Sequence, residues 1–336
     1  MKFVTDYPVR SDFDGEWIKP STITSVCKHI EAAGFNGLGI TDHPAPSLKW
    51  LQRGGHEAFD PFAMLSFLAA VTTEVKLLTH LLVLPYRNPL LQLSGMTSVD
   101  VLSGGRAIFV LGTGYLRSEF SAVGVEFDER NDLFDESIAV IKQASTGEEI
   151  SFEGKHFTAL SQTVQPAFIQ KPHPPLWLGG NSGRVLDRIA EWGEGWSVMM
   201  GPAELSNTAR TKPISTIEDL AAVLKDLQGR VEARGRSMAD ISIQASTPTI
   251  RFSSGSSAEE QIDEIGRLTE LGVSWVQVDP WTDSIPESLD RLQQFSEAVI
   301  ARTTLAGKLT NGPVLCETTH GEHHTESWNH GSSGTG

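Results

Sequence analysis

Cysteine and basic side chains are scarce in this sequence. Only two cysteines, Cys27 and Cys316, occur among 336 residues. Two thiols can form one disulfide at most, which excludes the class of small disulfide-rich secreted domains. Lys and Arg number 27 against 42 Asp and Glu, so the formal net charge is −15. A surface of this sign repels nucleic acid and anionic membranes, and we expect neither as a partner.

Long hydrophobic runs are also lacking. No stretch approaches the roughly 20 apolar residues that a bilayer-spanning helix requires. The amino terminus is polar at Lys2 and again at Thr5 and Asp6, too early for the apolar region of a secretory signal. We therefore expect a cytoplasmic protein.

Apolar segments compatible with strands alternate with segments of helical period along most of the chain. The expected strands are residues 3–7, 37–41, 75–84, 106–112, 176–179, 195–199, 241–246 and 273–278. They are apolar runs rather than alternating ones, which is typical of a parallel sheet covered on both faces. Eight strands and eight helices predict a single (β/α)₈ barrel over residues 1–302. A doubly wound open sheet is the alternative.

Helix starts carry recognisable signals. Asp60 before Pro61 predicts an N-cap followed by proline at the first helical position. Capping-box spacing is found at Ser215 with Glu218 and at Ser257 with Glu260. Cys27 lies in the apolar stripe of an early helix, which predicts a buried thiol.

Two segments depart from the alternation. Residues 145–175 show no clear helix and contain a short hairpin pattern around residues 152–157. A loop of this length is usually functional, and in a barrel it would lie near the mouth if it folds back. Residues 303–336 are rich in glycine and poor in apolar side chains, so we expect a disordered tail there.

Candidate chemical groups follow from the expected fold, because barrel enzymes carry their active sites at the carboxyl ends of the strands. Those ends hold Asp42 and His43, Thr79 and His80, residues 113–119, residues 179–182, and Asp279. A histidine near neutral pKa can exchange a proton or hold an anion. A metal-dependent hydrolase would need a convergent set of ligands, and no two histidines share a strand at alternate positions. We therefore expect no metal site.

Glycine turns follow two of these strands. Gly112-Thr113-Gly114 lacks the third glycine and the distal acid of a dinucleotide fingerprint, so we interpret it as a tight turn that lets a planar ring approach the backbone. Residues 179–182 (Gly-Gly-Asn-Ser) come just before a periodic helix. Backbone amides at such a position bind phosphate well.

Four motifs, in this order along the chain, together resemble the luciferase-like flavin and deazaflavin oxidoreductases. They are Thr41-Asp42-His43-Pro44, residues 82–106 with Leu82-Val83-Leu84-Pro85-Tyr86-Arg87-Asn88-Pro89 at their start, Leu111-Gly112-Thr113-Gly114-Tyr115, and residues 171–182 ending in Gly179-Gly180-Asn181-Ser182. The resemblance runs from about Lys2 to Ala301 and is greatest to the coenzyme F420-dependent subgroup. It implies a (β/α)₈ barrel, a homodimer formed through the early helices, and coenzyme F420 as cofactor, with FMN as the alternative.

The resemblance also implies roles for individual residues. Asp42 and His43 would face the cofactor ring, and a non-proline cis peptide at or next to His80, beside Thr79, would support its rear face. Gly112, Thr113 and Gly114 would lie along the ring and its ribityl chain. Gly179 and Gly180, with Asn181 and Ser182 nearby, would hold the phosphate.

Two departures from the family pattern narrow the function. Sugar-phosphate dehydrogenases of the superfamily have a tryptophan four residues after the histidine, where this chain has Ser47, and a glutamate directly after the glycine turn, where it has Tyr115. Glu119 could replace that glutamate if its loop folds inward. We expect hydride transfer between F420 and a small organic substrate, with His43, Tyr115 and Glu119 as catalytic candidates. FMN-dependent monooxygenation and a non-catalytic cofactor-binding protein are the alternatives.

Overall fold

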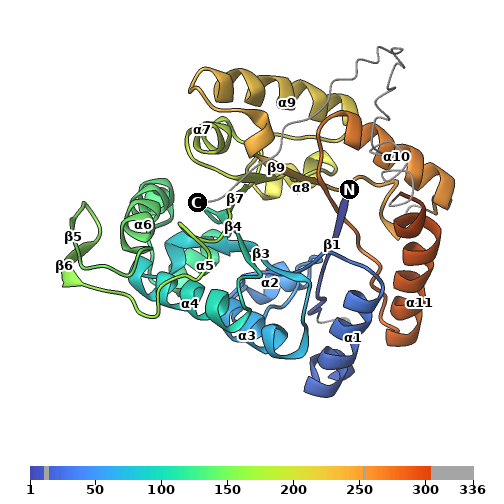
Figure 1. Ribbon diagram of the computed structural model, residues 1–336, viewed down its shortest axis with the longest axis horizontal. Coiled ribbons are helices and arrows are strands. Elements are labelled where there is room, and N and C mark those ends of the chain that lie inside the picture. The colour runs from blue at the N-terminus through green and yellow to red at the C-terminus, as the bar shows by residue number, and fades with distance from the viewer. Residues whose placement is uncertain (11–14, 253–254, 304–336) are drawn as a thin grey trace, which may run out of the picture.

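The computed structural model describes residues 1–10, 15–252 and 255–303, and at its centre eight parallel strands close into a barrel (Figure 1). The strands are β1 (Lys2–Asp6), β2 (Gly37–Ile40), β3 (Lys76–Val83), β4 (Ala107–Gly112), β7 (Leu176–Gly179), β8 (Gly195–Ser197), β9 (Ser242–Ala245) and β10 (Trp275–Gln277). Each pairs with the next in this order, and β10 pairs with β1. The predicted barrel is confirmed, and the open-sheet alternative is wrong because no barrel strand is left as an edge.

A ring of eight helices covers the outside of the barrel, one after each strand (Figure 1). They are α1 (Pro20–Ala32), α3 (Pro61–Val71), α4 (Pro89–Leu102), α6 (Arg130–Ala144), α7 (Gly183–Glu191), α9 (Ile217–Glu232), α10 (Ala258–Glu270) and α11 (Ile285–Phe295). Shorter elements lie in the loops: η1 (Gly15–Ile18), α2 (Leu48–Leu51), η2 (Leu84–Tyr86), α5 (Arg117–Ala122), η3 (Phe127–Glu129), α8 (Ala203–Thr208) and η4 (Met238–Asp240). The π-helical η6 (Ser296–Ile300) directly continues α11. No helix in the described ranges is long and apolar enough to cross a membrane.

The strands are apolar on both sides because each side meets a different packed layer. Outward side chains such as Leu38 and Leu77 are buried in the main core that contains the helices. A separate cluster inside the barrel consists of Val4, Leu78, Ile108, Val110, Trp177 and Trp275. Trp177 and Trp275 meet edge to face at 5.5 Å near the amino ends of their strands. This packing fills the lower barrel and leaves the carboxyl ends of the strands as the place for a ligand.

The helix-start predictions are confirmed at two of three positions. Asp60 accepts hydrogen bonds from the backbone of Phe62 and Ala63, both at 3.0 Å, with Pro61 at the first position of α3. Ser257 and Glu260 form the predicted capping box of α10.

The prediction for α9 is wrong by one residue. Its capping box joins Thr216 and Asp219 rather than Ser215 and Glu218. The Ser215 hydroxyl is used elsewhere, because it donates to the carbonyl of Gly201 at 2.9 Å. The Asp219 carboxylate accepts the backbone N–H of Thr216 at 3.1 Å, which closes the box.

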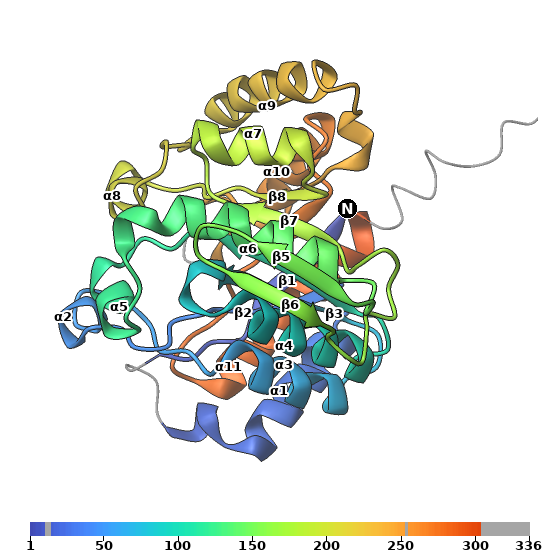
Figure 2. The same ribbon diagram turned by 90° about the vertical axis from the view of Figure 1, so that its left-hand side faces the viewer.

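Residues 145–175 form the predicted hairpin, but not at the barrel mouth. Strands β5 (Ile150–Glu153) and β6 (Thr158–Gln162) pair antiparallel on the outer side of α6 (Figure 1, Figure 2). The Glu136 carboxylate on α6 holds the turn by accepting the N–H groups of His156 at 3.0 Å and Phe157 at 2.8 Å. None of residues 145–175 lines the cavities described below, so this segment does not fold back to the mouth.

Cys27 is fully buried, as its place in the apolar stripe predicted. The expected disordered tail begins at residue 303, and its residues 304–336, including Cys316, lie outside the described residues.

Candidate functional site at the carboxyl ends of the barrel strands

Two adjoining cavities, each of about 350 Å³, lie at the carboxyl ends of the strands. The main cavity extends over the turns that follow β4 and β7, between residues 112–116 and 179–185. The side cavity extends over the ends of β1 and β10, between residues 6–10 and 277–281. Residues that line both are Thr41, His56, Ser246, Arg251 and Gln277. A molecule in one cavity can therefore contact a molecule in the other.

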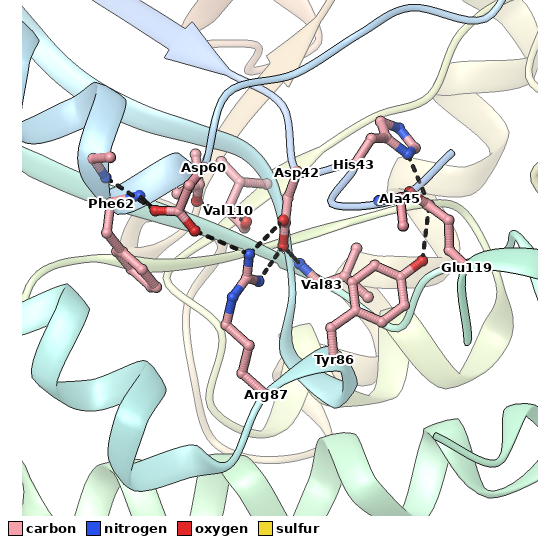
Figure 3. A network of polar contacts seen from close by, with 12 residues as sticks. Asp42, His43, Ala45, Asp60, Phe62, Val83, Tyr86, Arg87, Val110 and Glu119 are labelled. Carbon is pink, nitrogen blue, oxygen red and sulfur yellow. Dashed lines mark hydrogen bonds and ion pairs between the residues drawn. The ribbon is translucent and has the colours of Figure 1, made fainter. Parts of the chain in front are cut away.

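Asp42 lies below the barrel mouth, and its side chain holds together the chain segments that form the site. Its carboxylate forms a bidentate pair with Arg87, with Oδ2 to Nη1 at 2.7 Å and Oδ1 to Nη2 at 2.9 Å (Figure 3). It also accepts the N–H of Val83 at the end of β3, at 3.0 Å. The side chain of Asp42 is 1% exposed. These bonds tie the end of β2 to the loop after β3, and they occupy the oxygens that were expected to face a ring.

His43 is held by a buried carboxylate. Its Nδ1 lies 2.9 Å from Oε2 of Glu119 on α5 (Figure 3). Glu119 is fully buried and also accepts the N–H of Ala45 at 3.2 Å and the phenol hydroxyl of Tyr86 at 3.1 Å. Since a carboxylate only accepts, the His43 proton lies on Nδ1, and Nε2 faces away from this pair. The loop that carries Glu119 therefore folds inward. This is the condition under which we expected Glu119 to replace the glutamate that the family has directly after the glycine turn.

Aromatic rings enclose His43 on its other sides. The indole of Trp50 lies 4.6 Å from the imidazole, centroid to centroid, and the ring of Tyr115 lies 6.2 Å away. Trp50 belongs to α2, whose N-cap is Ser47, the hydroxyl of which accepts the N–H of Trp50 at 3.3 Å. The site therefore has a tryptophan beside its histidine, although Ser47 occupies the family position. Burial, and then the charge of Glu119, raise the pKa of Tyr115 to about 12.

His80 lies inside the barrel rim with both ring nitrogens bonded. Nδ1 is 2.7 Å from the carboxylate of Asp6, and Nε2 is 2.8 Å from the hydroxyl of Ser197. The amide of Gln277 donates to Asp6 at 2.7 Å, and that of Gln244 lies 3.0 Å from Nε2. Burial opposes a charge on this ring, but the Asp6 carboxylate outweighs it and raises the pKa of His80. Asp6 Oδ1 and Gln244 Oε1 have no hydrogen-bond partner among the described residues, and His80 and Gln277 of this polar cluster also form part of the main cavity wall.

Leu81 forms the floor of the main cavity. The His80–Leu81 peptide bond is cis, as the resemblance implied. A Cβ placed on Gly112 or on Gly179 would lie 2.3 Å or 2.4 Å from a methyl group of Leu81. The glycines that end β4 and β7 therefore make room for Leu81, which presents an apolar surface to whatever lies above.

The backbone N–H groups of Gly180 and Asn181, in the turn after β7, are bonded within the protein. The sequence had predicted that amides of this turn would bind a phosphate. The N–H of Gly180 donates to the carbonyl of Ser197 at 3.3 Å, and the N–H of Asn181 donates to the hydroxyl of Thr211 at 2.6 Å. The Asn181 side chain is fully buried and bonds Met199 at both its oxygen and its nitrogen. These groups hold the turn itself and are not free to hold a phosphate.

The amides that remain are at the start of α7. Gly183 and Arg184 are the first residues of the helix, so their N–H groups have no partner within it. No hydrogen bond joins these two N–H groups to any residue in the described ranges. The Ser182 hydroxyl caps Val185 and lines the main cavity. A helix start of this kind attracts an anion through its N–H groups and its dipole.

Positive charge gathers beside this helix start in a chain that is acidic overall. Three guanidinium groups, of Arg130, Arg117 and Arg210, lie 4.0, 4.3 and 5.1 Å from the centre of the Phe127 ring. Arg210 also lines the main cavity. Burial lowers the pKa of Arg130, and the charges of Arg210, Arg117 and Arg184 lower it further, while Asp128, which pairs with Arg117 at 2.9 Å, acts in the opposite direction. This mutual repulsion would be relieved by an anion at the rim.

Most of the predicted site residues meet in the main cavity. Those that line it are Asp42, His43, His80, Gly112, Thr113, Gly114, Tyr115, Gly179, Gly180 and Ser182. Three do not line it: Glu119 lies behind His43, Thr79 donates to the carbonyl of Val110, and Asn181 holds the turn. Asp279 belongs to the wall of the side cavity. Sequence patterns did not indicate Trp50, His56, Arg210 or Thr211, because all four lie outside the segments with strand or helical periodicity.

A buried histidine–carboxylate pair, an apolar floor and an anion-attracting helix start thus meet at the mouth of this (β/α)₈ barrel. Residues 3–307 match the family model of the luciferase-like monooxygenases, and the chain belongs to this family.

Individual relatives differ in cofactor. This chain is 30% identical to an FMNH₂-dependent dimethylsulfone monooxygenase of Pseudomonas putida over 131 residues. These residues are 37% of this chain and 36% of the relative. Over 191 residues, 55% of this chain and 54% of the relative, the chain is 29% identical to an F420-dependent glucose-6-phosphate dehydrogenase of Kineococcus radiotolerans. The chain thus spans about half or less of the length of these curated relatives. The crystal structure of monooxygenase RslO1 from Streptomyces bottropensis superposes with a TM-score of 0.74 at 18% identity, covering 90% of this chain and 100% of that one, and it shows the same fold.

Proposed function

We propose that this protein is an oxidoreductase that transfers a hydride between coenzyme F420 and a small organic substrate. The observation that carries the proposal is the pairing of His43 with the buried Glu119 at the wall of the main cavity. A fully buried carboxylate that holds a histidine by one nitrogen leaves the other nitrogen oriented for proton exchange. The F420-dependent relative supports this choice of cofactor.

The residues of the main cavity fit a flavin-type cofactor with a phosphate. The helix start at Gly183 and Arg184, with Ser182 and Arg210 beside it, would hold the phosphate. The turn at residues 112–114 and the apolar floor of Leu81 would lie against the ring. When bound, the cofactor supplies the two-electron chemistry, and the protein supplies position and electrostatics.

His43 would then hold or release a proton at Nε2, while Glu119 keeps its Nδ1 protonated. Tyr86 and the N–H of Ala45 also donate to Glu119, so both oxygens of this buried carboxylate accept hydrogen bonds. Trp50 covers the face of the imidazole and limits its rotation. The ring is therefore fixed by contacts that do not involve the cavity side.

FMN-dependent monooxygenation is the second candidate, and the Pseudomonas relative favours it. A monooxygenase of this kind must exclude water from a reactive oxygen adduct. The wall of the side cavity includes Asp6, Arg10, Arg251 and Asp279, and this cavity adjoins the main one. Such charged walls retain water, which supports hydride transfer over oxygen chemistry.

A binding experiment separates the two cofactors. Purified protein is titrated separately with F420 and with FMN, by absorption spectroscopy and calorimetry. We expect tighter binding of F420. FMN binding at least tenfold tighter, about 1.4 kcal/mol, would overturn the choice and favour the monooxygenase. Reduction of a chromogenic acceptor by the loaded protein then distinguishes an enzyme from a non-catalytic cofactor carrier.

We further propose a homodimer that uses α4. Leu91 and Leu102 are 71% and 62% exposed and lie three turns apart on one face of this helix, with Ser94 and Ser98 between them. Exposed leucines joined by small residues are typical of a helix that packs on another helix. Sedimentation analysis should show a dimer for the parent chain and a monomer after Leu91→Glu with Leu102→Glu.

A further inference from the structure

His56 occupies the junction of the two cavities. It lies between α2 and α3, follows the glycine pair Gly54 and Gly55, and contributes to the wall of both cavities. Its ring meets that of His43 edge to face, with 4.9 Å between centroids, and lies 5.4 Å from the indole of Trp50. A side chain in this place can contact a molecule in the side cavity while its ring stays in contact with the ring of His43.

The hydrogen bonds of His56 determine which nitrogen carries its proton. Nδ1 lies 3.1 Å from the backbone carbonyl oxygen of Glu57 and 3.5 Å from the hydroxyl of Thr41. A carbonyl oxygen only accepts, so the proton of the neutral ring lies on Nδ1. Nε2 has no hydrogen-bond partner among the described residues and carries a lone pair. It is therefore a proton acceptor beside the two cavities.

The wall of the side cavity indicates what kind of molecule would fit there. Two residues with carboxylates, Asp6 and Asp279, and two with guanidinium groups, Arg10 and Arg251, line this cavity. Opposite charges in equal number leave little net attraction for an ion, while their hydrogen-bonding atoms suit hydroxyl groups. Trp281 and Val278 add apolar surface. This combination suits an uncharged molecule with both hydroxyl groups and carbon surface.

We infer that the side cavity binds an uncharged carbinol, or the matching carbonyl compound, and that Nε2 of His56 exchanges the proton on its oxygen. This inference rests on the proposed function. In the oxidising direction, the carbinol C–H bond breaks and its electron pair leaves as hydride to the oxidised deazaflavin or flavin. The C=O π bond forms from the O–H electron pair, and the proton passes to Nε2 of His56, while the proton that His43 exchanges would be that of the reduced cofactor. Two electrons are transferred, and the reverse direction returns hydride to carbon and the proton to oxygen.

The electrostatic surroundings keep His56 ready to accept this proton. Burial lowers the pKa of His56, and a charge on His43 lowers it further, while Asp6 and Glu119 act in the opposite direction. Arg10, Arg251 and Asp279 are the other charged groups on the side-cavity wall. Because the net direction is downward, the ring is neutral at pH 7 and keeps its lone pair.

Binding to the cofactor-free, full-length protein tests the cavity first. The probes are 1,2-cyclohexanediol, cyclohexanecarboxylate and cyclohexylammonium, which share a ring and differ in charge. We expect calorimetry to show diol binding that is about tenfold tighter than that of either ion. Equal binding of an ion, or no binding of the diol, would overturn the inference.

His56→Asn tests the role of Nε2. The asparagine amide can keep the bond to the Glu57 carbonyl but has no atom at Nε2. The matched control is His173→Asn, since Nδ1 of His173 bonds the carbonyl of the next residue, Pro174, at 2.9 Å and His173 lines neither cavity. We expect His56→Asn alone to weaken diol binding and to remove its decrease at acidic pH. Unchanged diol affinity and pH profile in folded His56→Asn would overturn the inference.

Single-turnover kinetics of the loaded protein give a second, independent measurement. We expect His56→Asn to lower the rate by roughly 10²-fold and to remove the acidic limb of its pH profile. A purely structural role would lower the rate at all pH values and leave the limb in place, which would overturn the assignment of the proton to His56. If neither F420 nor FMN binds but the diol binds with the expected dependence on His56, the proposed function fails and the side-cavity site stands.

Discussion

Asp42 and His43 are adjacent in the chain, and their side chains point to different sides of the mouth (Figure 3). The carboxylate of Asp42 turns to Arg87 and to the N–H of Val83, while the ring of His43 turns to Glu119. Consecutive residues at a strand end point to opposite faces. Both residues line the main cavity, but the carboxylate of Asp42 holds the loops of the site, and the ring of His43 has its Nε2 free of the Glu119 pair.

The first prediction concerns Asp42. Asp42→Asn leaves the guanidinium of Arg87 without its bidentate partner. We therefore expect a loss of about 3 kcal/mol in the free energy of unfolding. This value is at the lower end of the range for broken buried ion pairs, because Arg87 retains some access to water. Urea denaturation measures the loss. The double variant with Arg87→Met removes both charges and should lose less than the single variant. Cofactor affinity of folded Asp42→Asn should change little, and a large loss would return Asp42 to the ring contact implied by the family.

The second prediction concerns His43 and Glu119 as one unit. His43→Gln should lower single-turnover hydride transfer by roughly 10²–10⁴-fold, because glutamine cannot exchange a proton near neutral pH. Glu119→Gln should have a smaller effect, and the double variant should be no slower than His43→Gln alone. Tyr86→Phe removes another donor to the same carboxylate and is the matched control, with little effect on the rate. Multiplicative losses in the double variant would show that the two residues act separately.

The third prediction places the phosphate at the start of α7. Gly183→Pro removes one N–H, and proline is well accommodated at the first position of a helix. Ser182 before it is extended, with φ −73° and ψ 154°, as a residue preceding proline requires. We expect cofactor affinity to fall by about 1.5–3 kcal/mol, the range for one hydrogen bond to a charged group.

The control for that variant is Gly183→Ala. A Cβ at Gly183 meets no atom within 4 Å, so alanine adds the same carbon and keeps the N–H. Calorimetry should show near-parental affinity for alanine and the loss only for proline. Equal affinity of the two variants would place the phosphate elsewhere. Gly180 is a poor test site, because its φ of +100° strains any other residue.

The barrel and the place of the site could be predicted from the sequence, because both depend on local patterns. Apolar runs mark strands that are buried on both faces, and a strand end determines which residues reach the mouth. His43 and the turn at residues 112–114 were found in this way.

The remaining features depend on tertiary packing that no local pattern records. Trp50 and His56 reach His43 through the path of a non-periodic loop. The space that Gly112 and Gly179 leave is filled by Leu81, which lies far from both in sequence. Gly180 uses its N–H in the β7–β8 ladder, so the amides available for an anion are shifted to the start of α7.

The last prediction uses the tyrosines as probes of the site. The chain has only three, Tyr7, Tyr86 and Tyr115. Burial raises the pKa of each, and nearby Glu119 adds to the increase for Tyr86 and Tyr115; the pKa of Tyr115 reaches about 12. At pH 10 the unfolded chain should have about half of its tyrosines ionised, and the folded protein should have very few.

The sign of the stability change follows from the same shifts. A pKa that is raised on folding stabilises the protein fully below about pH 10, and this stabilisation is lost as pH rises through the folded value. We therefore expect the tyrosinate absorbance of folded protein to appear late, near pH 12, and the free energy of unfolding to fall between pH 10 and 12. Tyr115→Phe should remove the component near pH 12 and make the fall less steep. Tyrosinate formation near pH 10 in the folded protein would show that Tyr115 is solvated. A Tyr115 that keeps its proton throughout the working range can donate a hydrogen bond beside His43 but cannot act as the base.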